Sequence, residues 1–191
     1  MLKPIDVMLV GVGGQGTILA TKVLARVAQD IGYDIKVSEI KGMAQRGGSV
    51  VTQVRLAPQV HSPLIPLGGA DVILSFEKLE ALRWLDYLKP DGTMIINDQA
   101  INPVPVLIGA ATYPDNVLDY IKGKVQKTEV VNALDIAVKC GNARTANVVL
   151  LAVLAKHLPI DRQSWEQALT AVVPEKFIEV NRAAFNEGYT L

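Results

Sequence analysis

The chain has 191 residues, half of them apolar and 5% aromatic, and its 19 basic and 19 acidic side chains leave no net charge. This length suits one domain, residues 1–191, which needs neither a disulfide nor a metal for stability. The lack of a basic tract argues against nucleic-acid binding. The single cysteine, Cys140, excludes an internal disulfide, a four-cysteine zinc site and a cysteine-bound iron–sulfur cluster.

The first apolar run contains Pro4 and Asp6 and passes directly into a glycine-rich turn. A buried strand has this pattern, whereas a signal peptide does not. The longest apolar run, 148–155, is far shorter than the ~20 residues that span a bilayer. With its one thiol, the sequence therefore predicts a cytoplasmic protein that is not bound to a membrane.

Strands and helices alternate along the first half of the chain. Leu19, Val23 and Val27 recur four residues apart, and Gly32 follows as a helix terminator, so the pattern predicts a helix over 17–31. A second helix is expected over 77–88, with its leucines facing inward. Apolar runs predict strands at 5–10, 33–39, 49–56, 71–76 and 93–97.

The second half is less regular. Residues 104–111 are interpreted as containing a short strand, and 127–131 as the last strand of the sheet. Helices are expected over 115–122, 133–139, a buried segment capped by Asn142, 161–173 and 174–187. Strands that alternate with helices predict an α/β fold: a Rossmann-like, doubly wound, mostly parallel sheet with helices on both faces.

Residues 11–16 match the pattern G-x-G-x-x-G between a strand and a helix, through Gly11, Gly13, Gly14, Gln15 and Gly16. Small residues at a helix N-terminus let a phosphate approach free N–H groups. Glu39 ends the second expected strand, where a dinucleotide enzyme places the acid that binds its ribose. The same glycines also serve a tight turn and close helix–sheet packing alone, so both interpretations stay open.

A second glycine-bearing segment, KGMAQRGG at 41–48, follows the second expected strand. Loops at the carboxyl ends of parallel strands gather at one edge of a sheet, so this loop should face the glycine turn. Arg46 offers a fork of donors for a carboxylate or phosphate, with Gln45, Gly47 and Gly48 around it. The alternative is a flexible, solvated loop.

These segments carry a resemblance to a known family. GVGGQGTILATKVLA (11–25), EIKGMAQRGGSVVTQVR (39–55), ADVILSFEKLEALRWLDYLKPDGTMIIN (70–97) and GNARTANVVLLAVLAKHLPI (141–160) resemble the gamma-type subunits of 2-oxoacid:ferredoxin oxidoreductases. Among them, the beta subunit of the indolepyruvate type is the most similar. The resemblance implies oxidative decarboxylation of a 2-oxoacid with coenzyme A, giving acyl-CoA, CO₂ and reduced ferredoxin.

The resemblance also implies which subunit binds which cofactor. Thiamine diphosphate, Mg²⁺ and iron–sulfur clusters are expected in a large partner subunit, and ferredoxin is the electron acceptor of the complex. This chain is expected to bind no metal, to have no catalytic residue and to be inactive alone. Its functional edge would be residues 11–16 and 45–48, facing coenzyme A, another anion or the partner, with Arg46 as the anion contact. A free-standing NAD(P)- or flavin-dependent oxidoreductase and a nucleotide-binding regulatory module are the alternatives.

Overall fold

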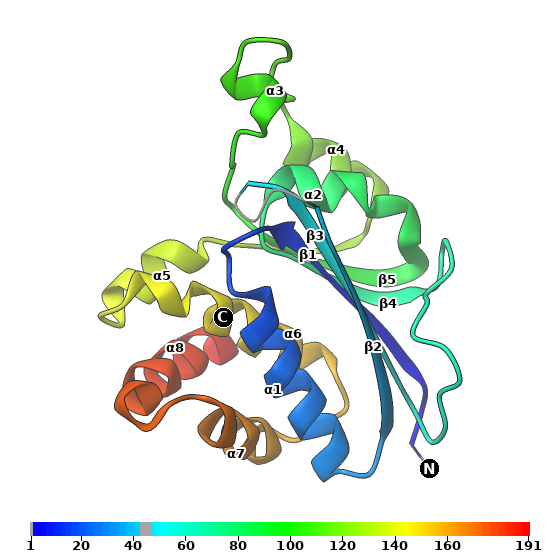
Figure 1. Cartoon of the computed structure of the whole chain (residues 1–191), viewed down its shortest axis with the longest axis vertical. Coiled ribbons are helices and arrows are strands. Elements are labelled where there is room, and N and C mark those ends of the chain that lie inside the picture. Colours follow the sequence, from blue (N-terminus) through cyan, green and yellow to red (C-terminus); the bar gives the residue numbers. More distant parts are fainter. Residues whose placement is uncertain (1, 43–46) are drawn as a thin grey trace.

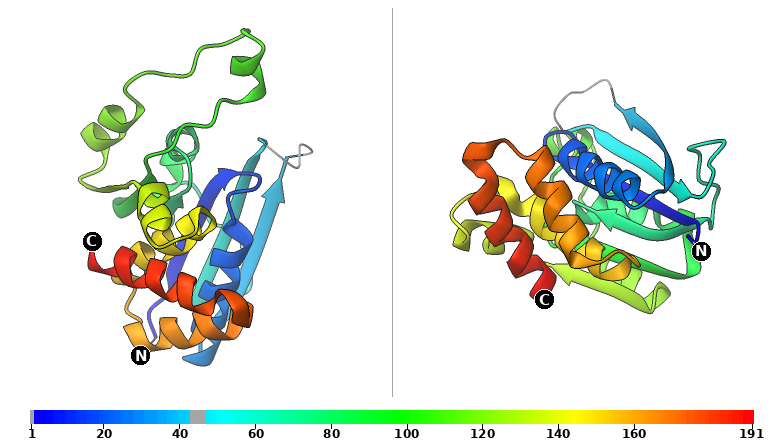
Figure 2. Two further views of the ribbon diagram at one scale, coloured as in Figure 1. Left: turned by 90° about the vertical axis from the view of Figure 1, so that its left-hand side faces the viewer. Right: turned by 90° about the horizontal axis from the view of Figure 1, so that it is seen from below.

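The computed structural model describes residues 2–42 and 47–191, in which a six-stranded sheet lies between two layers of helices (Figures 1 and 2). The strand order is β2–β3–β1–β4–β5–β6. The strands are β1 (Ile5–Val12), β2 (Asp34–Lys41), β3 (Ser49–Ala57), β4 (Ala70–Ser75), β5 (Leu88–Asn97) and β6 (Lys127–Val131).

The sheet is mostly parallel, which confirms the expected fold class. β1, β4, β5 and β6 are parallel neighbours, whereas β3 runs antiparallel to both β1 and β2. Only residues 42–48 join β2 to β3. A parallel crossover needs a dozen or more residues, so this short connection forces a hairpin. β2 therefore points the same way as β1 but lies two strands away from it.

Both faces of the central strands are buried, as parallel strands require. Along β1, Val7 and Leu9 face one layer of helices, and Met8 and Val10 face the other; all four are fully buried. The first layer contains α1 (Thr17–Asp30), α5 (Ala133–Lys139), α6 (Ala146–His157), α7 (Arg162–Val172) and α8 (Ile178–Thr190). The second contains α2 (Lys78–Arg83) and α4 (Val117–Lys124).

Helix α6 is the centre of the first layer. Residues 147–155 are all buried, as expected of a helix that is apolar all round. α8 packs closely on it: a Cβ at Gly188 would lie 2.4 Å from the Val149 carbonyl oxygen, so only glycine fits there. No helix among the described residues is long and apolar enough to cross a membrane.

The single helix expected over 77–88 is wrong. α2 ends at Arg83, a 3₁₀ turn η1 (Leu85–Tyr87) follows, and β5 already begins at Leu88. The pairing of β5 with β4 shifts register between Ala70 and Val72, so residues 89–92 lie inside the strand as an irregularity. Within α2, Glu80 and Ala81 are buried, and Leu82 packs half-buried against the same core, as expected of an inward-facing leucine.

The strand expected within 104–111 is also wrong, because these residues carry the short helix α3 (Val104–Leu107). Pro103 caps this helix and Pro105 lies in its first turn, where a missing N–H costs nothing. In a strand, the same proline would break the hydrogen-bond ladder. α3 belongs to a segment that projects from the body of the molecule (Figures 1 and 2). We call residues 101–113 the arm.

Boundaries in the last third differ in detail. β6 and α5 confirm the expected 127–131 and 133–139. Asn142 caps a 3₁₀ turn, η2 (Ala143–Thr145), rather than α6 itself. Pro174 likewise caps η3 (Glu175–Phe177), and α8 begins only at Ile178.

Candidate functional site

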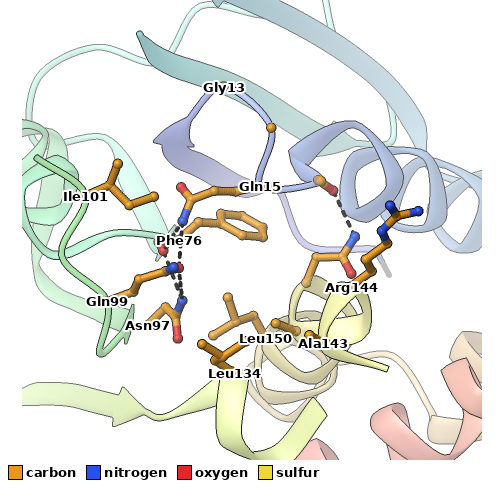
Figure 3. A pocket seen from close by; sticks show the side chains of 14 residues that line it. Gly13, Gln15, Phe76, Asn97, Gln99, Ile101, Leu134, Ala143, Arg144 and Leu150 are labelled. Atoms are coloured by element: carbon orange, nitrogen blue, oxygen red, sulfur yellow. Dashed lines mark hydrogen bonds between the residues drawn. The ribbon is translucent and has the colours of Figure 1, made fainter. Parts of the chain in front are cut away.

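A cleft of about 750 Å³ opens at the carboxyl edge of the parallel strands (Figure 3). Its walls come from the glycine turn between β1 and α1, the ends of β4 and β5, and the starts of α5 and α6. After β1, the chain continues to β2 and β3 on one side of β1 in the sheet, whereas β4 lies on the other side of β1. Ligands of open α/β sheets bind at such a switch point, so this cleft is the candidate site.

Two glycines of the turn are required by the structure itself. Gly16 is the N-cap of α1 in the left-handed conformation, with φ of 81°, and a Cβ there would lie 2.5 Å from Asn147 Nδ2. A Cβ at Gly11 would lie 2.9 Å from both Phe76 Cβ and Gln15 Oε1. The turn and the close approach explain these two positions without any ligand.

Gln15 is the polar anchor of the turn. Its Oε1 accepts a hydrogen bond from the Val12 N–H at 2.8 Å, and its Nε2 donates to the Phe76 carbonyl at 2.7 Å. Nε2 also lies 3.1 Å from Gln99 Oε1 (Figure 3). The side chain therefore ties the end of β1 to the segments after β4 and β5, and it borders the cleft while doing so.

Asn97 completes this network from the last position of β5. Its Nδ2 donates to the Phe76 carbonyl and to Gln99 Oε1, each at 3.1 Å, and its Oδ1 accepts from the Ala133 N–H at 3.2 Å. Three amide side chains thus join the ends of β1, β4 and β5 and the start of α5. These shared hydrogen bonds cross-link the floor of the cleft.

Asn147 occupies the opposite wall, in the first turn of α6. The residue is 6% exposed, and its Nδ2 donates to the Gly16 carbonyl at 3.1 Å. Its Oδ1 is buried and has no hydrogen-bond partner within residues 2–42 and 47–191. A buried acceptor without a donor is unfavourable, so this atom would gain from a ligand or water that donates a hydrogen bond.

The cleft is also electropositive. The N-terminus of α1 meets the cleft, and no side chain caps its free N–H groups. α6 also begins there, but it continues from η2, so the Ala146 N–H already donates to the Ala143 carbonyl. The free end of α1 carries a partial positive charge that favours anions. Arg144, exposed on η2, adds a full positive charge on the rim (Figure 3).

The described end of the second glycine segment, at Gly48, contacts the first segment, as expected. The Gly13 N–H donates to the Gly48 carbonyl at 2.9 Å, and the Gly42 N–H donates to the Ser49 carbonyl at 3.1 Å. Gly47 is left-handed and exposed. Gln45 and Arg46 lie outside the described residues, so their part in the site stays a prediction. Lys41 pairs with Glu39 at 3.2 Å.

A buried carboxylate supports the cleft from the side of β4. Glu77 is 1% exposed and accepts hydrogen bonds from the Glu80 N–H at 2.9 Å, the Ile101 N–H at 3.1 Å and the Tyr113 hydroxyl at 2.5 Å. Burial, and then the bond to Glu77, raises the pKa of Tyr113 above its ordinary value. Tyr113 therefore remains a neutral donor, and both ends of the arm are held at one carboxylate.

The comparisons with known proteins identify the family of this chain. The family model "Pyruvate ferredoxin/flavodoxin oxidoreductase" matches residues 6–191. The chain belongs to this family. The resemblance drawn from the glycine-bearing segments is therefore confirmed.

Individual relatives support the same conclusion. Indolepyruvate oxidoreductase subunit IorB of Thermococcus kodakarensis is 40% identical over 98% of this chain and 95% of its own length. The gamma subunit of a keto/oxoacid ferredoxin oxidoreductase from Geobacter sulfurreducens has a TM-score of 0.72 at 25% identity, covering 97% and 96% of the two chains. A 2-oxoglutarate:ferredoxin oxidoreductase from Magnetococcus marinus shares the fold, with a TM-score of 0.76 at 19% identity, over 100% of this chain and 31% of that one.

The position of Glu39 does not suit the dinucleotide interpretation. In that interpretation, the acid ends the strand next to β1. Here β3 lies between them, so Glu39 is on the edge strand, two strand spacings, or about 10 Å, from β1. Its carboxylate is exposed and pairs with Lys41. The glycine pattern is present in this family member, but the ribose-binding acid is not where a dinucleotide would need it.

The donor groups do not fit a metal cofactor either. Outside residues 1 and 43–46, no group of three His, Cys, Asp or Glu side chains is placed to hold a metal ion. Cys140 is the single cysteine of the sequence, and burial raises the pKa of its thiol. An iron–sulfur cluster needs several thiolates, which a single cysteine cannot supply.

Sequence reasoning missed three residues of the site: Asn97, Gln99 and Asn147. Asn97 could have been found, because it ends a buried strand at the edge where the glycine turn was expected. Asn147 gives a weaker signal, a single amide at the start of an otherwise apolar helix. Gln99 gives none, because a glutamine in a loop is ordinary.

Proposed function

We propose that this chain is the subunit of a 2-oxoacid:ferredoxin oxidoreductase that carries no redox cofactor, and that its cleft forms one wall of a site completed by a larger subunit. The complex would convert a 2-oxoacid, coenzyme A and oxidised ferredoxin into acyl-CoA, CO₂ and reduced ferredoxin. Thiamine diphosphate, Mg²⁺ and the iron–sulfur clusters would belong to the larger subunit. The 40% identity to an indolepyruvate oxidoreductase subunit favours an aryl or branched 2-oxoacid.

The observation that carries the proposal is the cleft of this family member, which offers groups that bind anions. The uncapped N-terminus of α1 and Arg144 suit the phosphates of coenzyme A. The unpaired Oδ1 of Asn147 suits a donor on the same ligand. We propose that residues 1–191 act as one domain in the cytoplasm, where a single unpaired cysteine is ordinary.

A free-standing NAD(P)- or flavin-dependent enzyme is the main competitor, and a nucleotide-binding regulatory module is another. The glycine turn supports both, but the edge position of Glu39 weakens the first. Calorimetry of the isolated chain with NAD, NADP and FAD separates these functions. Micromolar binding that is lost in Glu39→Ala would favour the dinucleotide enzyme.

Co-purification with the larger subunit tests the proposal directly. The complex should oxidise indolepyruvate or a related 2-oxoacid with ferredoxin and coenzyme A, while each subunit alone should not. Complete turnover by this chain without a partner would overturn the proposal.

Replacing Arg144 probes the anion role in the assembled complex. Arg144→Ala removes a charge-assisted contact, so the KM for coenzyme A should rise about tenfold while kcat changes little. Arg26→Ala is the matched control, because Arg26 pairs with Asp30 at 2.8 Å on the exposed face of α1. Equal kinetics of the Arg144 variant and the control would remove Arg144 from the site. Arg46→Ala should behave like Arg144→Ala if Arg46 is also an anion contact.

A further inference from the structure

We propose that the arm, residues 101–113, is a docking element whose apolar tip inserts into an uncharged groove of the larger, cofactor-bearing subunit. This inference rests on the proposed function, because it assigns the partner to a particular surface. The tip consists of Val104, Leu107 and Ile108.

The arm differs from the rest of the chain in composition. One residue in five of the whole sequence is charged, yet no charged residue occurs between Asp98 and Asp115. Val104, Leu107 and Ile108 are 57%, 69% and 72% exposed. Three large apolar side chains on one uncharged projection are an unfavourable surface in water and a typical interaction surface.

The arm is nevertheless ordered at its base. Ile101 and Tyr113 both donate hydrogen bonds to Glu77, at 3.1 and 2.5 Å, so the two ends of the arm meet at one buried carboxylate. Within the arm, the N–H groups of Ala110 and Ala111 donate to the Pro105 carbonyl at 2.8 and 3.1 Å. The tip is therefore held out from the body before any partner arrives, which lowers the entropic cost of docking.

The apolar surface continues from the arm to the cleft. Ile101 lines the cleft at the foot of the arm, and Leu134 of α5 lines it across from Ile101 (Figure 3). Leu134 is 42% exposed, and Val138, one turn further along α5, is 57% exposed. The tip alone exposes roughly 100 Å² for each side chain, whereas a stable interface needs about 800 Å² from each partner. A partner on the arm must therefore also cover the cleft rim and α5.

Four cavities on the described residues are poor acceptors for the tip of a second copy. The tip is convex, so it needs an apolar hollow. Each of four cavities in residues 2–42 and 47–191 has a charged side chain in its wall: Arg144, Asp86, Lys78 and Asp6. Covering such charges with an apolar tip would cost their hydration. The acceptor is accordingly assigned to another chain, and the larger subunit has to reach the same cleft.

Charge substitution on the tip tests the surface in the complex. Leu107→Asp should weaken the association of this chain with the larger subunit by about tenfold or more, measured by calorimetry or surface plasmon resonance. Leu67→Asp is the matched control, because Leu67 is 70% exposed in the loop before β4. This loop precedes the start of a parallel strand, whereas the arm follows the end of one. The control should bind within about twofold of wild type, and both variants should melt like wild type in isolation.

A photo-crosslinking amino acid at position 107, compared with position 67, identifies the occupant. Crosslinks from position 107 to the larger subunit support the inference. Crosslinks to a second copy of this chain overturn it, as does wild-type affinity in Leu107→Asp. A wild-type chain that forms no complex overturns the proposed function itself, which separates the two failures.

Discussion

The glycine turn and the arm both follow the carboxyl end of a parallel strand and border the same cleft, but they are stabilised in opposite ways. After β1, the chain turns at once, and Gln15 satisfies the backbone groups of Val12 and Phe76. After β5, the chain extends into the arm. Its two ends, Ile101 and Tyr113, donate hydrogen bonds to Glu77, and its apolar tip is exposed.

Because of this difference, the two segments at the carboxyl ends of the strands suit different binding partners. The turn is a polar wall that Gln15 ties to the neighbouring segments, with free N–H groups at the start of α1 and the unpaired Oδ1 of Asn147 beside it. The arm is an apolar surface whose stabilisation within the chain is incomplete, because its tip is exposed to water. A wall of the first kind suits a small polar ligand, and a surface of the second kind suits a protein.

The largest effect is expected at Gly16. Gly16→Ala forces an L-residue to φ of 81° and places its Cβ 2.5 Å from Asn147 Nδ2, so the free energy of unfolding should fall by about 3 kcal/mol. Gly14→Ala is the control, because its φ is 102° but no atom lies within 4 Å of the added Cβ. Its loss should be about 1 kcal/mol. Equal losses in urea unfolding would show that the contact with Asn147 is unimportant.

A smaller loss of stability is expected when the side chain of Gln15 is removed. Gln15→Ala removes the acceptor of the Val12 N–H and one of two donors to the Phe76 carbonyl. The free energy of unfolding should fall by about 1–2 kcal/mol. Gln29→Ala, on the exposed side of α1, should stay within about 0.5 kcal/mol of wild type. If both variants unfolded alike, the amide network would not stabilise the turn.

The smallest effect is expected at the base of the arm. Tyr113→Phe removes the hydroxyl between Glu77 and the Leu79 N–H, so stability should fall by about 1 kcal/mol at neutral pH. The folded state raises the pKa of Tyr113 above its ordinary value of 10.0. The resulting stabilisation is present below pH 10 and lost as the pH rises above it, so the gap between variant and wild type should narrow there.

Exposed Tyr120 provides the control, since Tyr120→Phe should change neither the stability nor its pH dependence. A gap for Tyr113→Phe that stays constant or widens above pH 10 would contradict the role given to its hydroxyl.

The sequence predicted most of the fold because its signals were local. The apolar runs of β1 and β4 and the helical spacing of α1 can each be recognised from a few consecutive residues, without reference to the rest of the chain. Errors arose where a local signal was ambiguous: the 104–111 run is apolar enough for a strand, but two prolines start a helix there. The single helix over 77–88 failed because β5 takes up Leu88 through pairing with β4, which no local pattern records.

By itself, the sequence determined the family, the mostly parallel α/β fold and the place of the glycine turn, because these depend on motifs and on short-range hydrophobic spacing. Only the tertiary structure decided what surrounds that turn. The strand order moved Glu39 to the sheet edge, and packing brought Asn97 and Asn147 to the turn from distant parts of the chain. Such placements follow from long-range strand pairing and helix packing, which join residues that share no local pattern.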